Sequence, residues 1–421
     1  MKNKAIETTR TQETPSRQRT LRLAEVVRQN LYAFVIREGM KALDEVLEQD
    51  RERLCGHAYA KGTPSEPVRW GRSEGRLVMG GRRVIVSKPR VRVKDKEVAL
   101  PSWAQFADED PLSERAIEQV VLGVSTRGYD RSVEELPDEL GAHGASKSAV
   151  SRRLVTTTQE KLGAWLKRDL SKLSIAMVML DGIEVGEQMV IVALGIDETG
   201  QKHPLGLWQG ATENSTVCEN LLNHLVERGL DPQKAYLFVI DGSKALRKAI
   251  RVIFGVRSLV QRCQEHKRRN VLSHLPKKLH PSISKMLRDA YTSASRATAK
   301  KRLQQVVAHL DDEHPDAAES LREGLDETLS LKDLKLPASL ERTLSTTNPI
   351  ENMNGQIRRV TRNVKRWRNG AMVKRWVALA VIEAARGFRR LRGYQGMPVL
   401  LDALRRHAEQ IIRIDEKEQA A

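Results

Sequence analysis

Apolar residues near the start of the chain recur at helical intervals and then change to an alternating pattern. Residues 21–54 therefore predict a long helix, whose apolar stripe we expect to face a core or a partner helix. Residues 56–75 are rich in glycine and proline, as in a linker. Valines alternate with other residues at positions 84, 86, 91 and 93, which predicts a small β-ribbon that also carries Arg and Lys. The stripe of the helix includes Leu23, Val27, Leu31, Val35, Leu43 and Leu47.

Residues 112–160 predict three short helices, arranged as a helix-turn-helix. Ser146 fits the cap of the last one, in which Ala149, Val150 and Leu154 would pack inward. Pro137 weakens this interpretation because it removes a backbone donor inside the middle helix, and an ordinary helical linker is the alternative. The side chains expected to face a DNA groove are Lys147, Ser148, Ser151 and Arg152.

The pattern from residue 174 to residue 270 predicts three strands, a helix, a strand, a helix and a strand. The second and third strands flank a hairpin turn at residues 197–200, in which Asp197 acts only as a turn residue. This βββαβαβ succession is the ribonuclease H arrangement, in which the first and fourth strands lie side by side. The fold class is therefore α/β, with a ribonuclease H-like mixed sheet.

Two aspartates follow buried runs within this succession. Asp181 follows residues 175–180 (IAMVML), and Asp241 follows residues 236–240 (YLFVI). Each is followed by glycine, so either one alone would more often be a strand-to-turn signal. Because the strands that carry them are expected to be neighbours, the two carboxylates should lie close together.

Glu351 is the third candidate carboxylate. It opens a helix whose apolar stripe runs from Ile350 to Val364, while Asn354 is expected on another face. Its competing interpretation is structural, since Asn348 followed by proline and Glu351 fits a helix cap. Between positions 358 and 375 the chain has eight Arg or Lys and no acidic residue. We read this as a basic helix that binds phosphate, with a solvated basic helix as the alternative. The expected contacts are Arg358, Arg359, Arg362 and Lys365.

The composition indicates a nucleic-acid partner. Lys plus Arg number 72 and Asp plus Glu number 54, which gives a net charge of +18. The cysteines are Cys55, Cys218 and Cys263, which form neither an even disulfide set nor a pair of C-x-x-C clips. Residues 1–20 have no apolar core that would fit a signal peptide, and no apolar run approaches the roughly 18 residues needed to span a bilayer. We expect a cytoplasmic, nucleoid-associated protein with no membrane partner.

Three blocks of this chain resemble the signature blocks of the bacterial mutator-type insertion-sequence transposases. They are residues 241–246 (DGSKAL), 261–270 (QRCQEHKRRN) and 346–354 (TTNPIENMN). The resemblance spans about residues 181–385 and implies a DDE transposase, with a helical insertion before the final Glu. It implies that the catalytic and metal-binding triad is Asp181, Asp241 and Glu351, in agreement with the choice made from the residues.

The second block also contains the family's C-x-x-H element, here Cys263 and His266, whose role is uncertain. It is half a zinc site at most, and structural packing is the simpler interpretation. Lys267, Arg268 and Arg269 directly after it are expected to contact phosphate.

The expected activity is DNA cleavage followed by strand transfer, with two Mg²⁺ ions, or Mn²⁺ as a substitute, held by the three carboxylates. The expected partners are double-stranded DNA, as terminal inverted repeats and target, and further copies of the chain in a homodimer or higher oligomer. A ribonuclease H-like host nuclease or junction resolvase and a non-catalytic DNA-binding regulator are the alternatives.

The sequence divides into seven expected segments. These are a flexible basic tail (1–20), a helix and β-ribbon region (21–110), a helix-turn-helix-like domain (111–170), the first part of the catalytic core (171–280), a helical insertion (281–345), the final Glu helix with the basic helix (346–390) and a C-terminal helix (391–421).

Overall fold

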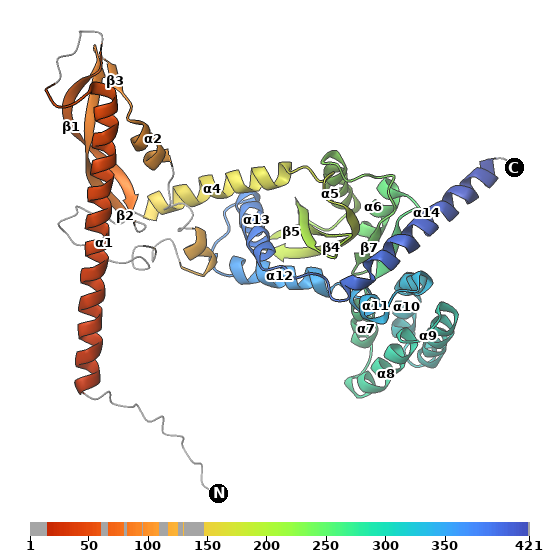
Figure 1. Ribbon diagram of the computed structural model, residues 1–421. Helices are drawn as coiled ribbons and strands as arrows, with labels where there is room; N and C mark the ends of the chain where they lie inside the picture. The colour runs from red at the N-terminus through yellow and green to blue at the C-terminus, as the bar shows by residue number, and fades with distance from the viewer. Residues whose placement is uncertain are drawn as a thin grey trace, which may run out of the picture. The chain divides into compact units, whose positions relative to one another are not determined.

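The computed structural model describes residues 15–59, 66–79, 82–94, 96–108, 117–124, 129 and 147–419 (Figure 1). The chain forms two compact units, Met1–Val155 and Thr156–Ala421, and each is described by itself. Much of the expected helix-turn-helix-like domain, at residues 111–116, 125–128 and 130–146, lies outside the described residues, as do residues 1–14 of the expected tail.

The N-terminal unit packs one long helix on a three-stranded antiparallel sheet. The helix and a β-ribbon at residues 84–93 were predicted, but β1 begins at Val68, inside the stretch expected to be a linker. Leu43 and Leu47 of the helix are buried against Leu77, Val86 and Val91 of the sheet. The helix begins at Pro15, inside the segment expected to be a tail, because the first turn of a helix tolerates proline's missing N–H. The elements are α1 (Pro15–Cys55), β1 (Val68–Met79), β2 (Arg82–Val93), β3 (Lys96–Val98) and α2 (Pro101–Asp108).

The next helix, α4 (Lys147–Lys167), begins directly after the predicted cap but is longer than a short recognition helix. Val150 and Leu154 are buried, while Ser148 and Arg152 are exposed, as expected for this segment.

A five-stranded mixed sheet forms the centre of the C-terminal unit. Its strand order is β6-β5-β4-β7-β8, and β4 pairs with β5 antiparallel and with β7 parallel. The chain order of three strands, a helix, a strand, a helix and a strand agrees with the prediction, as does the adjacency of the first and fourth strands. The elements are β4 (Ile175–Val185), β5 (Gln188–Asp197), β6 (Lys202–Gly210), α5 (Ser215–Glu227), β7 (Leu237–Ile240), α6 (Lys244–Phe254) and β8 (Leu259–Arg262).

Both faces of this sheet are covered, which explains why β4 is a continuous apolar run rather than an alternating one. Val178 and Leu180 pack in a core with residues of α5 and α6. Met177 and Met179 alternate with them and are also fully buried, so they face the opposite side. Helix α12 (Asn348–Thr361) contacts β4, and α13 (Gly370–Arg386) contacts β5 and β6.

The predicted helical insertion lies between β8 and α12 and has an apolar core of its own. Most of this core comes from α8, α9 and α10, and α7 adds Val271 and Leu272. The elements are α7 (Gln264–Ser273), η3 (Lys277–Leu279), α8 (His280–Tyr291), α9 (Arg296–Asp311), α10 (Pro315–Arg322), η4 (Asp326–Leu334) and α11 (Ala338–Leu344). After α13, the chain ends with η5 (Tyr394–Gly396) and α14 (Met397–Gln419).

Among the described residues, no helix is both long enough and apolar enough to pass through a membrane.

Candidate active site

Asp181 lies inside strand β4 and not at its end. It pairs with Val192 of β5, and the strand continues to Val185. The interpretation of Asp181-Gly182 as a strand-to-turn signal is therefore wrong. A Cβ atom at Gly182 would come within 2.7 Å of Glu213 Oε2, so a larger residue here would displace the end of the Glu213 side chain.

Asp241 directly follows β7, the parallel neighbour of β4. The last paired residues are Met179 and Val239, so both aspartates stand two residues further along adjacent strands. Asp241 also shapes a turn, since its Oδ1 accepts the N–H of Ser243 at 3.0 Å. Gly242 has a φ of +117°, and a Cβ atom there would approach Arg262 Nε to 2.2 Å, so only glycine fits.

Glu351 reaches the same region through helix α12. One turn further along, Asn354 donates from Nδ2 to Oδ2 of Asp181 at 2.6 Å, which ties the helix to the strand. Asn354 is only 1% exposed, so its expected place on a solvent-facing side of the helix is wrong. The expected cap also differs. The N-cap residue is Thr347, and its hydroxyl donates to Glu351 Oε1 at 2.7 Å.

The charges of Asp241 and Glu351 both act on Asp181. The pKa of Asp181 is raised to about 7, first by burial and then by the charges of Asp241 and Glu351. His266 and the hydrogen bond from Asn354 act in the opposite direction. The buried carboxyl of Asp181 is thus within electrostatic range of two other acidic groups, and their repulsion favours a proton or a cation there.

Glu213 is a fourth carboxylate at this location that the sequence analysis missed. Besides its closeness to Gly182, it has a raised pKa, caused by burial and by the charge of Asp241 and opposed by a hydrogen bond with Ser243. Glu213 immediately precedes Asn214, whose side chain caps α5. Its only sequence signal was that position before a cap, which is common for structural reasons.

Cys263 and His266 lie beside Glu351. The sulfur of Cys263 accepts N–H groups from His266 and Thr347, both at 3.4 Å. Burial raises the pKa of this thiol, but hydrogen bonds with His266 and Thr347 outweigh it and the net shift is downward. The pKa of His266 is raised to about 9, mainly by its hydrogen bond with Cys263. The C-x-x-H element thus packs against the start of α12.

A family model described as "Transposase, Mutator family" matches residues 12–390 of this chain. The chain belongs to this family. This match confirms the family resemblance that the three sequence blocks indicated, and it extends over nearly the whole chain.

Named relatives agree with this assignment. The chain is 29% identical over 389 residues to the transposase for insertion sequence element ISRM5 of Rhizobium meliloti, covering 88% of this chain and 92% of the relative. It is 27% identical over 286 residues to the transposase for IS256 in transposon Tn4001 of Staphylococcus aureus, covering 66% of this chain and 70% of that protein. A probable transposase for an insertion sequence element of Corynebacterium diphtheriae is 29% identical over 247 residues, which cover 55% of this chain and 69% of that protein.

The expected phosphate contact of Lys267 is wrong. Its side chain is fully buried and donates to the carbonyl oxygens of Ser320 and Glu323, both at 2.5 Å. Arg268 is partly buried and bonds to Glu265 and Ser284, while Arg269 is exposed and pairs with Glu265. The sequence showed three adjacent cations but not that the helix turns the first one inward.

The basic stretch after Glu351 does not form a single helix, contrary to the expectation. Helix α12 ends at Thr361 and α13 begins at Gly370, where Asn369 accepts the N–H of Met372 as a cap. The basic residues therefore lie on the end of α12, on a connecting segment and on the start of α13. The four expected phosphate contacts are nonetheless all exposed: Arg358, Arg359, Arg362 and Lys365.

On the expected recognition helix, Ser148 and Arg152 are exposed and Ser151 is half-buried, while the side chain of Lys147 lies outside the described residues.

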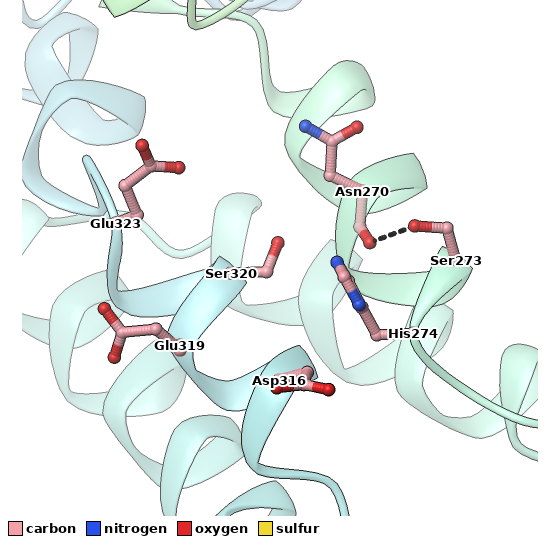
Figure 2. A pocket seen from close by; sticks show the side chains of 7 residues that line it. All are labelled: Asn270, Ser273, His274, Asp316, Glu319, Ser320 and Glu323. Atoms are coloured by element: carbon pink, nitrogen blue, oxygen red, sulfur yellow. Dashed lines mark hydrogen bonds between the residues drawn. The ribbon is translucent and has the colours of Figure 1, made fainter.

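A separate pocket of about 410 Å³ lies in the insertion, between α7 and α10 (Figure 2). Figure 2 shows Asn270, Ser273 and His274 facing Asp316, Glu319 and Ser320. With Glu323, three carboxylates line this pocket, so it repels phosphate and does not extend the basic surface.

Proposed function

We propose that this transposase binds the terminal inverted repeats of its element, cleaves DNA there and joins the freed end to a target. The catalytic residues in this proposal are Asp181, Asp241 and Glu351. The observation that supports it is the raised pKa of Asp181, to which the charges of Asp241 and Glu351 both contribute.

The fold supports the proposal. Two carboxylates on the adjacent parallel strands β4 and β7, with a third on a helix after a long insertion, fit a ribonuclease H-like core. We assign that fold to residues 171–280 and 346–390.

The residues at the site suit a divalent cation. The donors are oxygen atoms of carboxylates, which are the ligands that Mg²⁺ and Mn²⁺ prefer. Their mutual repulsion gives a cation a favourable place to bind, and Oδ1 of Asn354 is buried with no hydrogen-bond partner among the described residues. Two Mg²⁺ ions bound there would activate the attacking oxygen and stabilise the leaving oxygen of an in-line displacement at phosphorus.

The protein's own groups hold and orient the reactants. Asn354 fixes the carboxylate of Asp181, and the exposed cations of α12 and the following segment hold the DNA backbone. A water molecule first attacks the phosphodiester at the transposon end, and the 3′-oxygen leaves as a hydroxyl. That 3′-hydroxyl then attacks a target phosphodiester and displaces the target strand's own 3′-oxygen as a hydroxyl, so no covalent protein intermediate is needed. Bringing two ends together favours a homodimer or higher oligomer.

The test compares Asp181→Asn, Asp241→Asn and Glu351→Gln with Glu184→Gln. Glu184 is an exposed acid on the same strand as Asp181, so it controls for the loss of one charge. With labelled end-sequence DNA and Mg²⁺, we expect the three variants to lose at least about a hundredfold in cleavage rate, while Glu184→Gln behaves as the parent. A folded, DNA-binding Asp181→Asn that cleaves normally would refute the proposal.

The joining step separates transposition from the alternatives. A host nuclease or junction resolvase would give cleaved but never joined DNA, and a non-catalytic regulator would bind DNA without nicking it. Membership of the Mutator family favours joined products.

A further inference from the structure

The starts of helices α7 and α12 are held together at the sulfur of Cys263. This residue is fully buried, and its Sγ accepts one backbone N–H from its own helix, at His266, and one from Thr347. The N–H of Gln264 donates to the carbonyl of Ser345 at 2.9 Å, which adds a direct backbone link. The position of the α12 start is therefore fixed by the C-x-x-H turn.

The hydroxyl of Thr347 lies at the centre of this junction. Its Oγ1 is 2.7 Å from Glu351 Oε1, 3.2 Å from His266 Nδ1 and 3.4 Å from Cys263 Sγ. A hydroxyl has one proton to donate, and the short bond to a carboxylate is the strongest of the three. The oxygen then accepts from His266, which requires the proton of the imidazole to be on Nδ1.

We infer that Thr347 and His266 are positioning residues that hold the carboxylate of Glu351 toward Asp181. The inference rests on the proposed function, in which Glu351 is catalytic. A glutamate side chain has several rotatable bonds, and freezing them costs free energy each time a ligand binds. The chain His266 to Thr347 to Glu351 fixes one carboxylate oxygen in advance and leaves Oε2 for the reaction centre.

A zinc site is the competing interpretation of the same residues. One ligand atom each from Cys263, His266 and Glu351 lies within 4.8 Å of the others. Zinc requires ligands at roughly 2.0–2.3 Å around a shared centre. Here the hydroxyl of Thr347, itself fully buried, fills the space between them, which favours the hydrogen-bonded arrangement.

The decisive comparison is Thr347→Val against Thr347→Ser. Valine keeps the shape and removes the hydroxyl, whereas serine keeps the hydroxyl. The control is Thr361→Val, a buried threonine of the same helix whose hydroxyl bonds only to carbonyl oxygens of its own helix, at Ile357 and Arg358. Two quantities are measured: the Mn²⁺ affinity of the DNA-free protein, from the electron paramagnetic resonance of free Mn²⁺, and the cleavage rate as a function of Mg²⁺.

We expect Thr347→Val to weaken Mn²⁺ binding about tenfold and to slow cleavage by about ten- to a hundredfold, which is typical for loss of an outer-shell partner. Thr347→Ser should stay within about threefold of the parent, and Thr361→Val should match it. His266→Asn, which keeps an amide donor on a partly exposed side chain, should be milder than His266→Leu. This second pair decides the outcome if Thr347→Val does not fold.

The inference is wrong if Thr347→Val and His266→Leu, both folded, equal the parent in both measurements while Glu351→Gln is inactive. An active Glu351→Gln would refute the proposed function itself. Stoichiometric zinc in the purified protein, lost in Cys263→Ser, would also overturn the inference in favour of a metal cluster.

Discussion

Asp181 is held in an environment that opposes its own charge. It lies within the sheet beside two other carboxylates, and its pKa rises from an ordinary value of 3.8 to about 7. Because the native state prefers the protonated form, ionisation of this residue reduces stability. Keeping Asp181 ionised therefore costs folding stability, and a bound cation would offset this loss.

This cost predicts a pH-dependent effect of Asp181→Asn on the cation-free protein. The folded pKa lies above the unfolded one, so the contribution of Asp181 to the free energy of unfolding falls as the pH rises from about 4 to about 7. His266, which faces Asp181 and has its own raised pKa, titrates higher. We expect Asp181→Asn to be more stable than the parent by about 1–3 kcal/mol at pH 8, and by less at pH 5. Urea unfolding at both pH values, with Glu184→Gln as control, measures this, and an equal difference at both would contradict it.

At the scale of single residues, the sequence revealed the carboxylates but not the groups that support them. Asp181, Asp241 and Glu351 were visible because each has a recognisable place next to an apolar run. Asn354 and Thr347 were missed because their roles depend on which face of α12 meets β4 and α7, and local pattern does not specify that contact. Lys267 was misassigned for the same reason, since burial follows from packing against α10.

At the scale of elements, α7 and α10 are joined through buried cations. Lys267 and Arg262 donate to the carbonyl oxygen of Glu323, and Lys267 also donates to that of Ser320. These carbonyls stand at the C-terminal end of α10, where helix carbonyls lack intrahelical partners and the helix dipole favours positive charge. Because Arg262 belongs to β8, these bonds attach the insertion to the strand that pairs with β7. Asp241 directly follows β7.

We predict that Lys267→Met loosens this attachment. Two partly buried carbonyl oxygens lose a charged donor, although that of Glu323 keeps its bond from Arg262, so the free energy of unfolding should fall by about 1–3 kcal/mol. Amide hydrogen exchange should become faster in α10 and in residues 323–325, before it changes in β4. The control is Lys278→Met, an exposed lysine of the same insertion, which should leave exchange unchanged. Unaltered protection of α10 in Lys267→Met would show that the bonds do not stabilise the junction.

Elements with a strong local signal were predicted well. The apolar run 175–180 lies in β4, and residues 237–240 of the run 236–240 form β7, as expected. The basic stretch after Glu351 was predicted as one helix because its charges obscured a second start signal, Asn369 followed by Gly370. Charge periodicity alone does not distinguish a helix from two helix ends joined by a short segment.

At the scale of the whole molecule, the net charge of +18 is useful only where cations are free to meet phosphate. Many are not. Arg262 and Lys267 are buried, and Arg268 is engaged by Glu265. By contrast, exposed cations lie at the end of α12, the helix that carries Glu351, and on the segment that follows it. Position relative to the carboxylates, rather than total charge, should therefore decide DNA affinity.

The corresponding prediction replaces four cations by glutamine in each of two places. One variant changes Arg358, Arg359, Arg362 and Lys365, and the control changes Lys277, Lys278, Lys285 and Arg288, which are exposed cations of the insertion. Both lose the same formal charge. Each lost phosphate contact lowers the slope of log affinity against log salt by about 0.9, so the first variant should lose up to about 3–4 units of slope for any DNA sequence. The control should lose far less. If titrations at several salt concentrations gave equal losses for both variants, the molecule would bind DNA through its overall charge, and the surface beside Glu351 would have no special part in holding the substrate.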